Sequence, residues 1–117
     1  FDPAYQGYIS EVKAKEAQNT LQSIALEQKS YFSKQFCFYV TDTGDKAGLI
    51  NTGLFGSEFE EDGPIPIANN QYSFEITGTT SATCTGSNAV TFTATATNKR
   101  DDSEVFSISN TLKKTGF

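Results

Sequence analysis

The sequence contains no histidine, no methionine and no tryptophan. Histidine is the side chain most often used as a general base near neutral pH and the commonest ligand of transition metals in proteins. The serine, aspartate and lysine residues that are present form no nucleophile elbow, phosphate-binding glycine loop or metal-ligand set. We therefore expect a protein that is not an enzyme, has no catalytic residues and takes no small-molecule substrate.

Long apolar runs are also missing. No segment approaches the roughly 18 consecutive apolar residues that a membrane-spanning helix needs. The hydrophobic content of 37% and the charged content of 20% are typical of a globular chain. Because 117 residues suffice for one hydrophobic core but not for two, we expect a single domain over residues 1–117.

Positive charge is in deficit. Nine Lys and Arg residues face fourteen Asp and Glu residues, for a formal net charge of -5. This balance opposes general attraction to nucleic acid or to anionic lipid. Two short basic pairs, Lys99-Arg100 and Lys113-Lys114, are a poor electrostatic footprint for DNA, so nucleic acid is not the expected partner.

Cysteine is scarce. Cys37 and Cys84 are far apart and have none of the spacings of a metal site. We expect them to form a disulfide, which in the chain-entropy model would stabilise the fold by about 4 kcal/mol. That pairing favours a location outside the cytoplasm, whereas two buried free thiols in a cytosolic protein are the alternative.

The residues before Cys37 predict one long helix, over residues 1–36. Asp2 and Pro3 are a helix-start signature, and strong helix formers dominate the segment 11–34. One face has the three-four spacing of a buried stripe and is expected to pack on a core. Its residues are Ala14, Ala17, Leu21, Ile24, Gln28 and Tyr31, widened by Ala25 and Phe32.

A second group of apolar residues lies nearer the start of this helix. Tyr5, Tyr8, Ile9 and Val12 occupy a different angular sector from the stripe. Exposed apolar residues with no core beneath them mark an interface, so we predict a subunit-interface role for this group. The alternative is that they cover the end of their own domain.

Residues 37–70 form a glycine- and proline-rich connection that carries no long element. A connection of this length in a compact domain is usually functional. We expect six apolar residues to hold it against the core: Leu49, Ile50, Leu54, Phe55, Phe59 and Ile67.

Residues 71–117 alternate between apolar and polar side chains and predict an antiparallel sheet. The inward positions are expected to be Tyr72, Phe74 and Ile76, then Val90, Phe92, Ala94 and Ala96, then Phe106 and Ile108. One face of such a sheet must be covered, and the helix stripe is the available lid. The predicted architecture is α+β, one long N-terminal helix packed across an antiparallel sheet of three to four strands.

Three segments in this order resemble one family. The segment 3–10, PAYQGYIS, with the helical residues after it, resembles the N-terminal helix of type IVa pilins just after their hydrophobic segment. The segments 70–74, NQYSF, and 104–109, EVFSIS, are similar to strands of bacterial pilins. The resemblance implies the pilin fold. The chain differs from the best-known pilins in its cysteines, because their disulfide closes a loop at the C-terminus. We therefore do not carry over a C-terminal receptor-binding loop to this chain.

The resemblance implies a function and a location. Pilins polymerise through the N-terminal helix into an extracellular pilus, after anchoring in the inner membrane by an upstream apolar segment whose mature N-terminus is methylated. The implied partners are other copies of the chain and the pilus assembly machinery of the inner membrane. The implied roles are adhesion, twitching motility or DNA uptake. The alternatives are a minor pilin, a type II secretion pseudopilin or a stand-alone secreted binding domain.

Two charged clusters have open interpretations. Glu58, Glu60, Glu61 and Asp62 are a candidate Ca²⁺ site, although a solvated turn is the more common role of such a run and no EF-hand spacing is present. No other cofactor is expected. The acidic residues are also candidates for contacts with a neighbouring subunit's basic pairs.

The basic pairs are in turn candidates for intersubunit or DNA contacts; their residues are Lys99, Arg100, Lys113 and Lys114. We expect the displayed surface to comprise the connection 38–70 and the loop 78–89.

Overall fold

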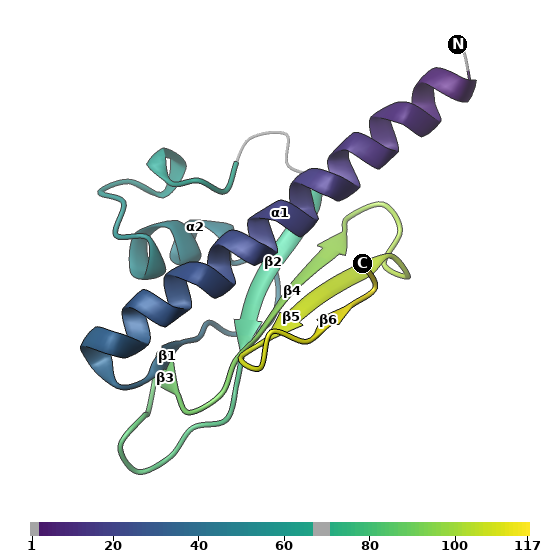
Figure 1. Cartoon of the computed structure of the whole chain (residues 1–117). Helices are drawn as coiled ribbons and strands as arrows, with labels where there is room; N and C mark the ends of the chain where they lie inside the picture. Colours follow the sequence, from purple (N-terminus) through teal and green to yellow (C-terminus); the bar gives the residue numbers. More distant parts are fainter. Residues whose placement is uncertain (1–2, 67–70) are drawn as a thin grey trace.

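The computed structural model describes residues 3–66 and 71–117, with side chains described from residue 11 onward. A long helix, α1 (Pro3–Gln35), lies diagonally across an antiparallel sheet (Figure 1). The predicted α+β architecture is confirmed. The residue after α1, Phe36, has a left-handed φ of 58°, and its N–H still donates to the carbonyl of Phe32 at 2.8 Å.

The main sheet has four strands in the order β2 (Tyr72–Thr77), β4 (Thr93–Asn98), β5 (Val105–Ser109) and β6 (Lys114–Thr115). Every pairing is antiparallel. The register places Ala96 opposite both Phe74 and Phe106. Small alanines therefore alternate with large side chains across one face, which leaves room for the helix to lie close to the sheet.

A second, two-stranded sheet pairs β1 (Phe38–Tyr39) with β3 (Asn88–Ala89). This small sheet was not predicted. The second strand was expected to include Val90, but β4 begins only at Thr93. Phe92, Ala94 and Ala96 are buried as expected, but Val90 is 41% exposed. The reason is that the chain crosses here from β3 to β4, and the N–H of Val90 bonds to the carbonyl of Thr79 instead of joining the main sheet.

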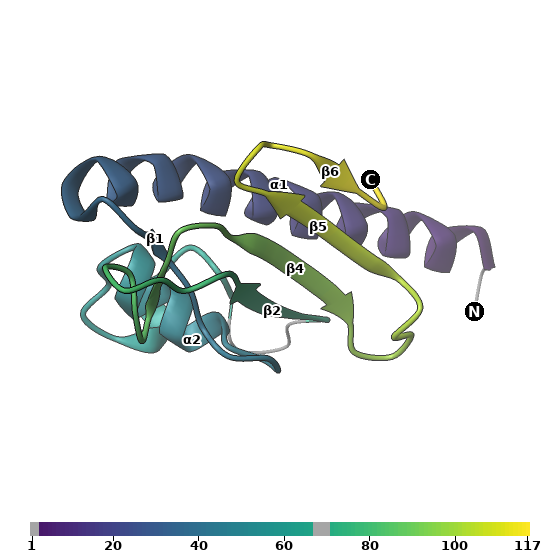
Figure 2. The same cartoon turned by 90° about the horizontal axis from the view of Figure 1, so that it is seen from below.

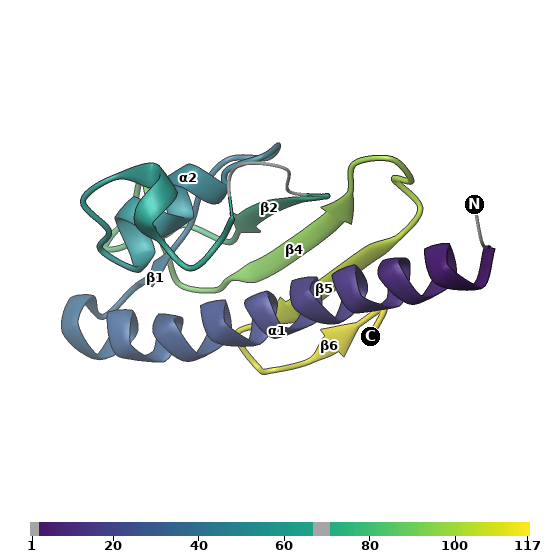
Figure 3. The same cartoon turned by 90° about the horizontal axis from the view of Figure 1, so that it is seen from above.

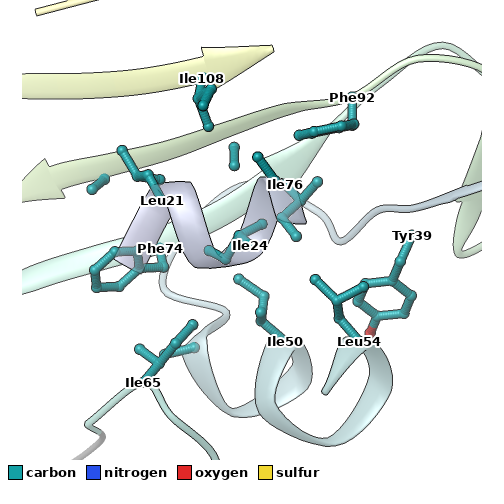
Figure 4. Packing of buried hydrophobic residues seen from close by; sticks show 14 of the residues in the cluster. Leu21, Ile24, Tyr39, Ile50, Leu54, Ile65, Phe74, Ile76, Phe92 and Ile108 are labelled. Atoms are coloured by element: carbon teal, nitrogen blue, oxygen red, sulfur yellow. The ribbon is translucent and has the colours of Figure 1, made fainter. Parts of the chain in front are cut away.

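The core lies between α1, the main sheet and the connection. Leu21 and Ile24 of α1 are fully buried among sheet residues such as Ile76, and Ile50 of the connection closes the third side (Figure 4). The face of α1 that was predicted to be buried therefore meets two partners. Burying one such aliphatic side chain contributes about 1.5–3 kcal/mol.

The connection contains three short helical segments: α2 (Ala47–Leu49), the π-helical η1 (Ile50–Leu54) and the 3-10 turn η2 (Glu60–Asp62). They pack beside β2, on one flank of the sheet (Figure 2). Of the six residues expected to hold the connection, Ile50 and Leu54 are buried and Phe55 is partly buried.

Two of those expectations are wrong and one falls outside the described residues. Leu49 and Phe59 are exposed, and Ile67 is not among the residues described. Phe59 follows Glu58 and precedes Glu60 in sequence, so burying its ring would draw charged groups out of water at high cost. Ile65, which was not predicted, is buried in its place.

The predicted disulfide between Cys37 and Cys84 is present, with its Cα atoms 5.8 Å apart. It joins the residue just after α1 to the loop that leads into β3. Both cysteines are buried. The covalent bond therefore fixes the far end of the helix to the small sheet.

Removing this disulfide is predicted to cost much of the stability of the fold. The two cysteines are 47 residues apart, and a loop of this length corresponds to about 4 kcal/mol in the chain-entropy model. The double variant Cys37→Ser/Cys84→Ser should lose that amount in urea unfolding followed by circular dichroism. Wild-type protein with and without reductant is the control, and equal midpoints for variant and oxidised wild type would contradict the prediction.

Candidate functional site

The N-terminal turns of α1 extend beyond the end of the sheet (Figures 1 and 3). Tyr5, Tyr8 and Ile9 of the predicted interface lie outside the described side chains. Val12, the fourth member, is 38% exposed, whereas Ala17 is buried in the core. The helix thus passes from a projecting segment to a core-covering segment within a few turns.

The core-covering segment of α1 carries the predicted apolar face. Ala17, Leu21 and Ile24 are buried, and Ala14 and Tyr31 pack partly buried against the core. The hydroxyl of Tyr31 donates a hydrogen bond of 2.6 Å to Oδ1 of Asn88, and burial raises the pKa of Tyr31. Ala25 is buried as well, but Phe32 is more exposed and its ring lies against Phe38, with 4.7 Å between centroids.

Gln28 is a buried polar residue within this apolar face. Its Nε2 donates to the carbonyl oxygen of Tyr39 at 2.6 Å, and the N–H of Tyr39 donates to its Oε1 at 2.8 Å. Burial, and secondarily Tyr31, raise the pKa of Tyr39. The sequence placed Gln28 in the stripe but gave no sign that its amide pairs with the main chain at β1.

Asn51 plays the same part for the connection. Its Nδ2 donates to the carbonyl oxygens of Glu60 at 2.7 Å and of Ile65 at 2.9 Å, and its Oδ1 accepts from the N–H of Ile65 at 3.0 Å. A Cβ on Gly63 would collide with this side chain, so the close approach requires glycine. A lone asparagine in an irregular segment carries no sequence signal for such a role.

These bonds hold the segment Glu58–Asp62, which we call the acidic turn. Its carboxylates and Phe59, which is 56% exposed, are all on the surface. Within the described ranges 3–66 and 71–117, no group of three or more acidic or cysteine side chains is placed to hold a metal ion. The Ca²⁺ hypothesis for this segment stays a prediction.

The basic residues singled out from the sequence fall into two places. Lys99 and Arg100 follow β4 at one end of β5, whereas Lys113 and Lys114 follow the other end of β5. Lys99 pairs with Asp45, with Nζ and Oδ2 3.0 Å apart. The structure therefore separates the two pairs and does not form one basic patch from them.

Lys114 instead lies near Lys29 of α1. Between the helix and the turn before β6 is a groove, which we call the basic groove. Leu26 on its rim is 70% exposed and Leu112 is 47% exposed. Sequence analysis missed the groove because its walls come from segments about 80 residues apart; its lining residues are Gln22, Ala25, Leu26, Lys29, Ile108, Leu112 and Lys114.

Two further polar groups lie at the end of the sheet near the β4–β5 turn. The hydroxyl of Tyr72 donates to Oε1 of Glu104 at 2.6 Å. Burial, then this carboxylate, raise the pKa of Tyr72 well above its usual range. The pKa of Asp101 is lowered because Ser103 donates hydrogen bonds to it. We assign these contacts to the geometry of the turn.

The amino-acid sequence of the chain has a match among known protein families. A family model described as "type IV minor pilin ComP, DNA uptake sequence receptor" matches residues 3–105. The chain belongs to this family. Its members are type IV pilins, so the resemblance to pilins is confirmed, and the chain is a structural, pilus-associated protein.

Two further comparisons were made, with curated proteins and with solved structures. No curated protein and no solved structure matches the chain significantly. The family match ends before most of β5, β6 and the basic pair Lys113-Lys114. Over the described ranges, no helix of this pilin has the length and apolar character needed to cross a membrane.

Asn51 is predicted to be the residue that contributes most to holding the acidic turn in place. Asn51→Ala should lower the free energy of unfolding by about 2–4 kcal/mol, because it leaves three main-chain partners without this side chain, two of them buried. Thr52→Ala, at the neighbouring position, should cost less than about 1 kcal/mol. Urea unfolding measures both, and hydrogen exchange at residues 60–65 should rise only in Asn51→Ala; unchanged exchange there would refute the role.

Proposed function

We propose that the chain is a minor subunit of a type IV pilus that enters the filament through the N-terminal part of α1. The observation that carries the proposal is the extension of α1 beyond the sheet that it covers (Figure 3). A helix segment without a core of its own beneath it is stabilised when other subunits cover it. Family membership favours this function over a stand-alone binding domain.

The partners in this proposal are other pilin subunits and the assembly machinery of the inner membrane, and the destination is the extracellular filament. Val12, exposed at the border of the projecting segment, is the described residue that supports the interface predicted for Tyr5, Tyr8 and Ile9. The segment 38–66 and the loop 78–89 would be displayed. The segment 38–66 begins next to Cys37 and the loop 78–89 contains Cys84, so the disulfide gives a rigid base to both surfaces.

Val12→Asp tests this interface. Val12 is not part of the core, so the free energy of unfolding should change by less than about 0.5 kcal/mol. A charge placed between packed helices is costly, so the amount of this chain in sheared filaments should fall at least tenfold by immunoblot. Ser23→Asp, at an exposed position on the same helix, is the matched control. Equal incorporation of both variants would contradict the proposal.

DNA uptake is the second candidate function, favoured because the family description names a DNA uptake sequence receptor. With a net charge of -5, any DNA contact must use a few local cations. Among the described residues, Arg100 and Lys113 are exposed and form no ion pair, whereas Lys99 is paired with Asp45. These two side chains are our candidates for phosphate contacts.

This role predicts weak and salt-sensitive binding. One to three phosphate contacts should lower the affinity for a duplex roughly 3- to 40-fold between 50 and 200 mM salt. Arg100→Ala/Lys113→Ala should weaken binding and flatten that dependence, while Lys99→Ala should change less. The affinity and its salt dependence are measured by fluorescence anisotropy with a labelled duplex and a scrambled competitor. No binding at 50 mM salt would exclude the role without touching the filament proposal.

A further inference from the structure

A short segment lies along the edge of β2 that faces away from β4. The N–H of Thr41 donates to the carbonyl of Ile76 at 2.6 Å, and the N–H of Lys46 donates to the carbonyl of Phe74 at 2.8 Å. The N–H of Ile76 donates in return to the hydroxyl oxygen of Thr41 at 3.0 Å. These bonds fix both ends of the segment 41–46, which we call the strap, to the sheet.

The middle of the strap is held as well. Gly44 has a φ of +107°, in the left-handed region that favours glycine. Its N–H donates to Oε1 of Glu75, on β2, at 3.1 Å. Asp45 follows this turn directly and precedes the second attachment to the sheet, at Lys46. The position of Asp45 is therefore set by the sheet and not by a free loop.

Asp45 meets one of the basic residues singled out from the sequence. Its Oδ2 lies 3.0 Å from Nζ of Lys99, the residue just after β4. The main chain of Lys99 is fixed in turn, because its N–H donates to the carbonyl of Gln71 at 2.8 Å. The side chains of Asp45 and Lys99 are 43% and 40% exposed, so a partner in solvent can reach the ammonium group.

Arg100, the other member of this basic pair, has no such carboxylate. Its N–H donates to Oδ1 of Asn98 at 2.9 Å, and among the described residues its exposed guanidinium forms no ion pair. The nearby carboxylate of Asp101 instead accepts from the hydroxyl of Ser103 at 2.6 Å. The β4–β5 turn thus carries one unpaired cation, and a second, Lys99, that the strap neutralises.

Phosphate and carboxylate are alternative partners for the same ammonium group. An exposed ion pair contributes little to stability, so Asp45 is not needed to hold the fold. It does, however, neutralise Lys99 and place a negative charge where a phosphate would bind. A polyanion that approaches Lys99 must displace a carboxylate that the attached strap returns to the same place. The strap therefore lowers the affinity of this surface for polyanions.

We propose that the strap is an autoinhibitory contact, in which Asp45 occupies Lys99 and weakens the binding of duplex DNA at the β4–β5 turn. The inference rests on DNA uptake, the second candidate function. Specificity requires an element that opposes the wrong partner as well as contacts that favour the right one. A duplex held by Arg100 and by additional contacts can displace Asp45, whereas a weakly held duplex gains nothing from Lys99. All residues of the contact belong to one copy, so a single subunit in a filament is sufficient.

Asp45→Asn tests the contact, because it keeps the size of the side chain and removes its charge. Once Lys99 is released from its partner, the affinity for a labelled duplex should rise about two- to fivefold at 50 mM salt, the range that exposed ion pairs are worth. The logarithmic salt dependence should steepen by about 0.9, the value for one additional phosphate contact. Fluorescence anisotropy measures both the affinity and its salt dependence.

Asp42→Asn is the matched control. Asp42 is an exposed carboxylate of the same strap and forms no ion pair among the described residues. Its removal changes the net charge equally, but the affinity should rise by less than about half as much, because a charge without a direct contact is screened. In a Lys99→Ala background, Asp45→Asn should give no gain. An equal gain with and without Lys99 would mean that Asp45 acts through net charge alone, and the inference would be wrong.

Urea unfolding of the same variants separates inhibition from a change in folding. Asp45→Asn and Asp42→Asn should keep the midpoint of wild type, because exposed charges contribute little to stability. A gain in DNA binding that accompanies a lower midpoint in Asp45→Asn would assign the gain to loss of folding and overturn the inference.

The outcomes also separate the inference from the function on which it rests. If wild type binds the duplex and both aspartate variants bind it equally well, the strap is not inhibitory and the DNA role stands. If wild type and all variants fail to bind at 50 mM salt, the DNA role and the autoinhibition are both excluded. The filament proposal is untouched by either result.

Discussion

The packing of Leu21 and Ile24 against the sheet is the interaction on which the rest of the molecule depends. An antiparallel sheet of this size leaves one apolar face that must be covered. Helix α1 is the element that covers it, and the alanines of β4 let it approach closely. Because the lid is one straight helix longer than the sheet, stabilising the core also fixes the direction in which the projecting segment points.

The irregular part of the fold is held differently, by the hydrogen bonds of two buried amide side chains and by one disulfide. Gln28 satisfies the main chain at β1, Asn51 satisfies that of the acidic turn, and the Cys37–Cys84 disulfide joins the helix end to the small sheet. A buried amide with paired partners stabilises one conformation, because every alternative leaves a polar group unsatisfied. Loops that lack regular hydrogen bonding can therefore be presented as fixed surfaces.

The features that sequence analysis predicted are those carried by local periodicity. The stripe through Leu21 and Ile24 and the alternation through Phe74 and Ile76 each reveal which side faces the core, because a helix and a strand have fixed repeats. The disulfide followed from the count and spacing of the cysteines. None of these inferences required knowledge of which segments become neighbours.

The features that were missed depend on such neighbours. Val90 continues the alternation of its strand, yet it is exposed because the chain changes sheets there. Phe59 has the apolar side chain of a core residue, yet it is exposed between charged neighbours on a turn that Asn51 holds. The groove joins Lys29 to Lys114, and no sequence pattern relates a helix residue to a turn near the other end of the chain.

The short strand β6 has a consequence for how copies of the chain can associate. The other margin of the sheet is bonded along part of β2 by the segment 41–46, so within the described residues β6 is the exposed margin. It is two residues long and includes Lys114. A margin this short and charged is a poor template for strand addition. Self-association by cross-β pairing, which is hard to reverse, is thereby disfavoured, and side-chain contacts that can be broken again remain.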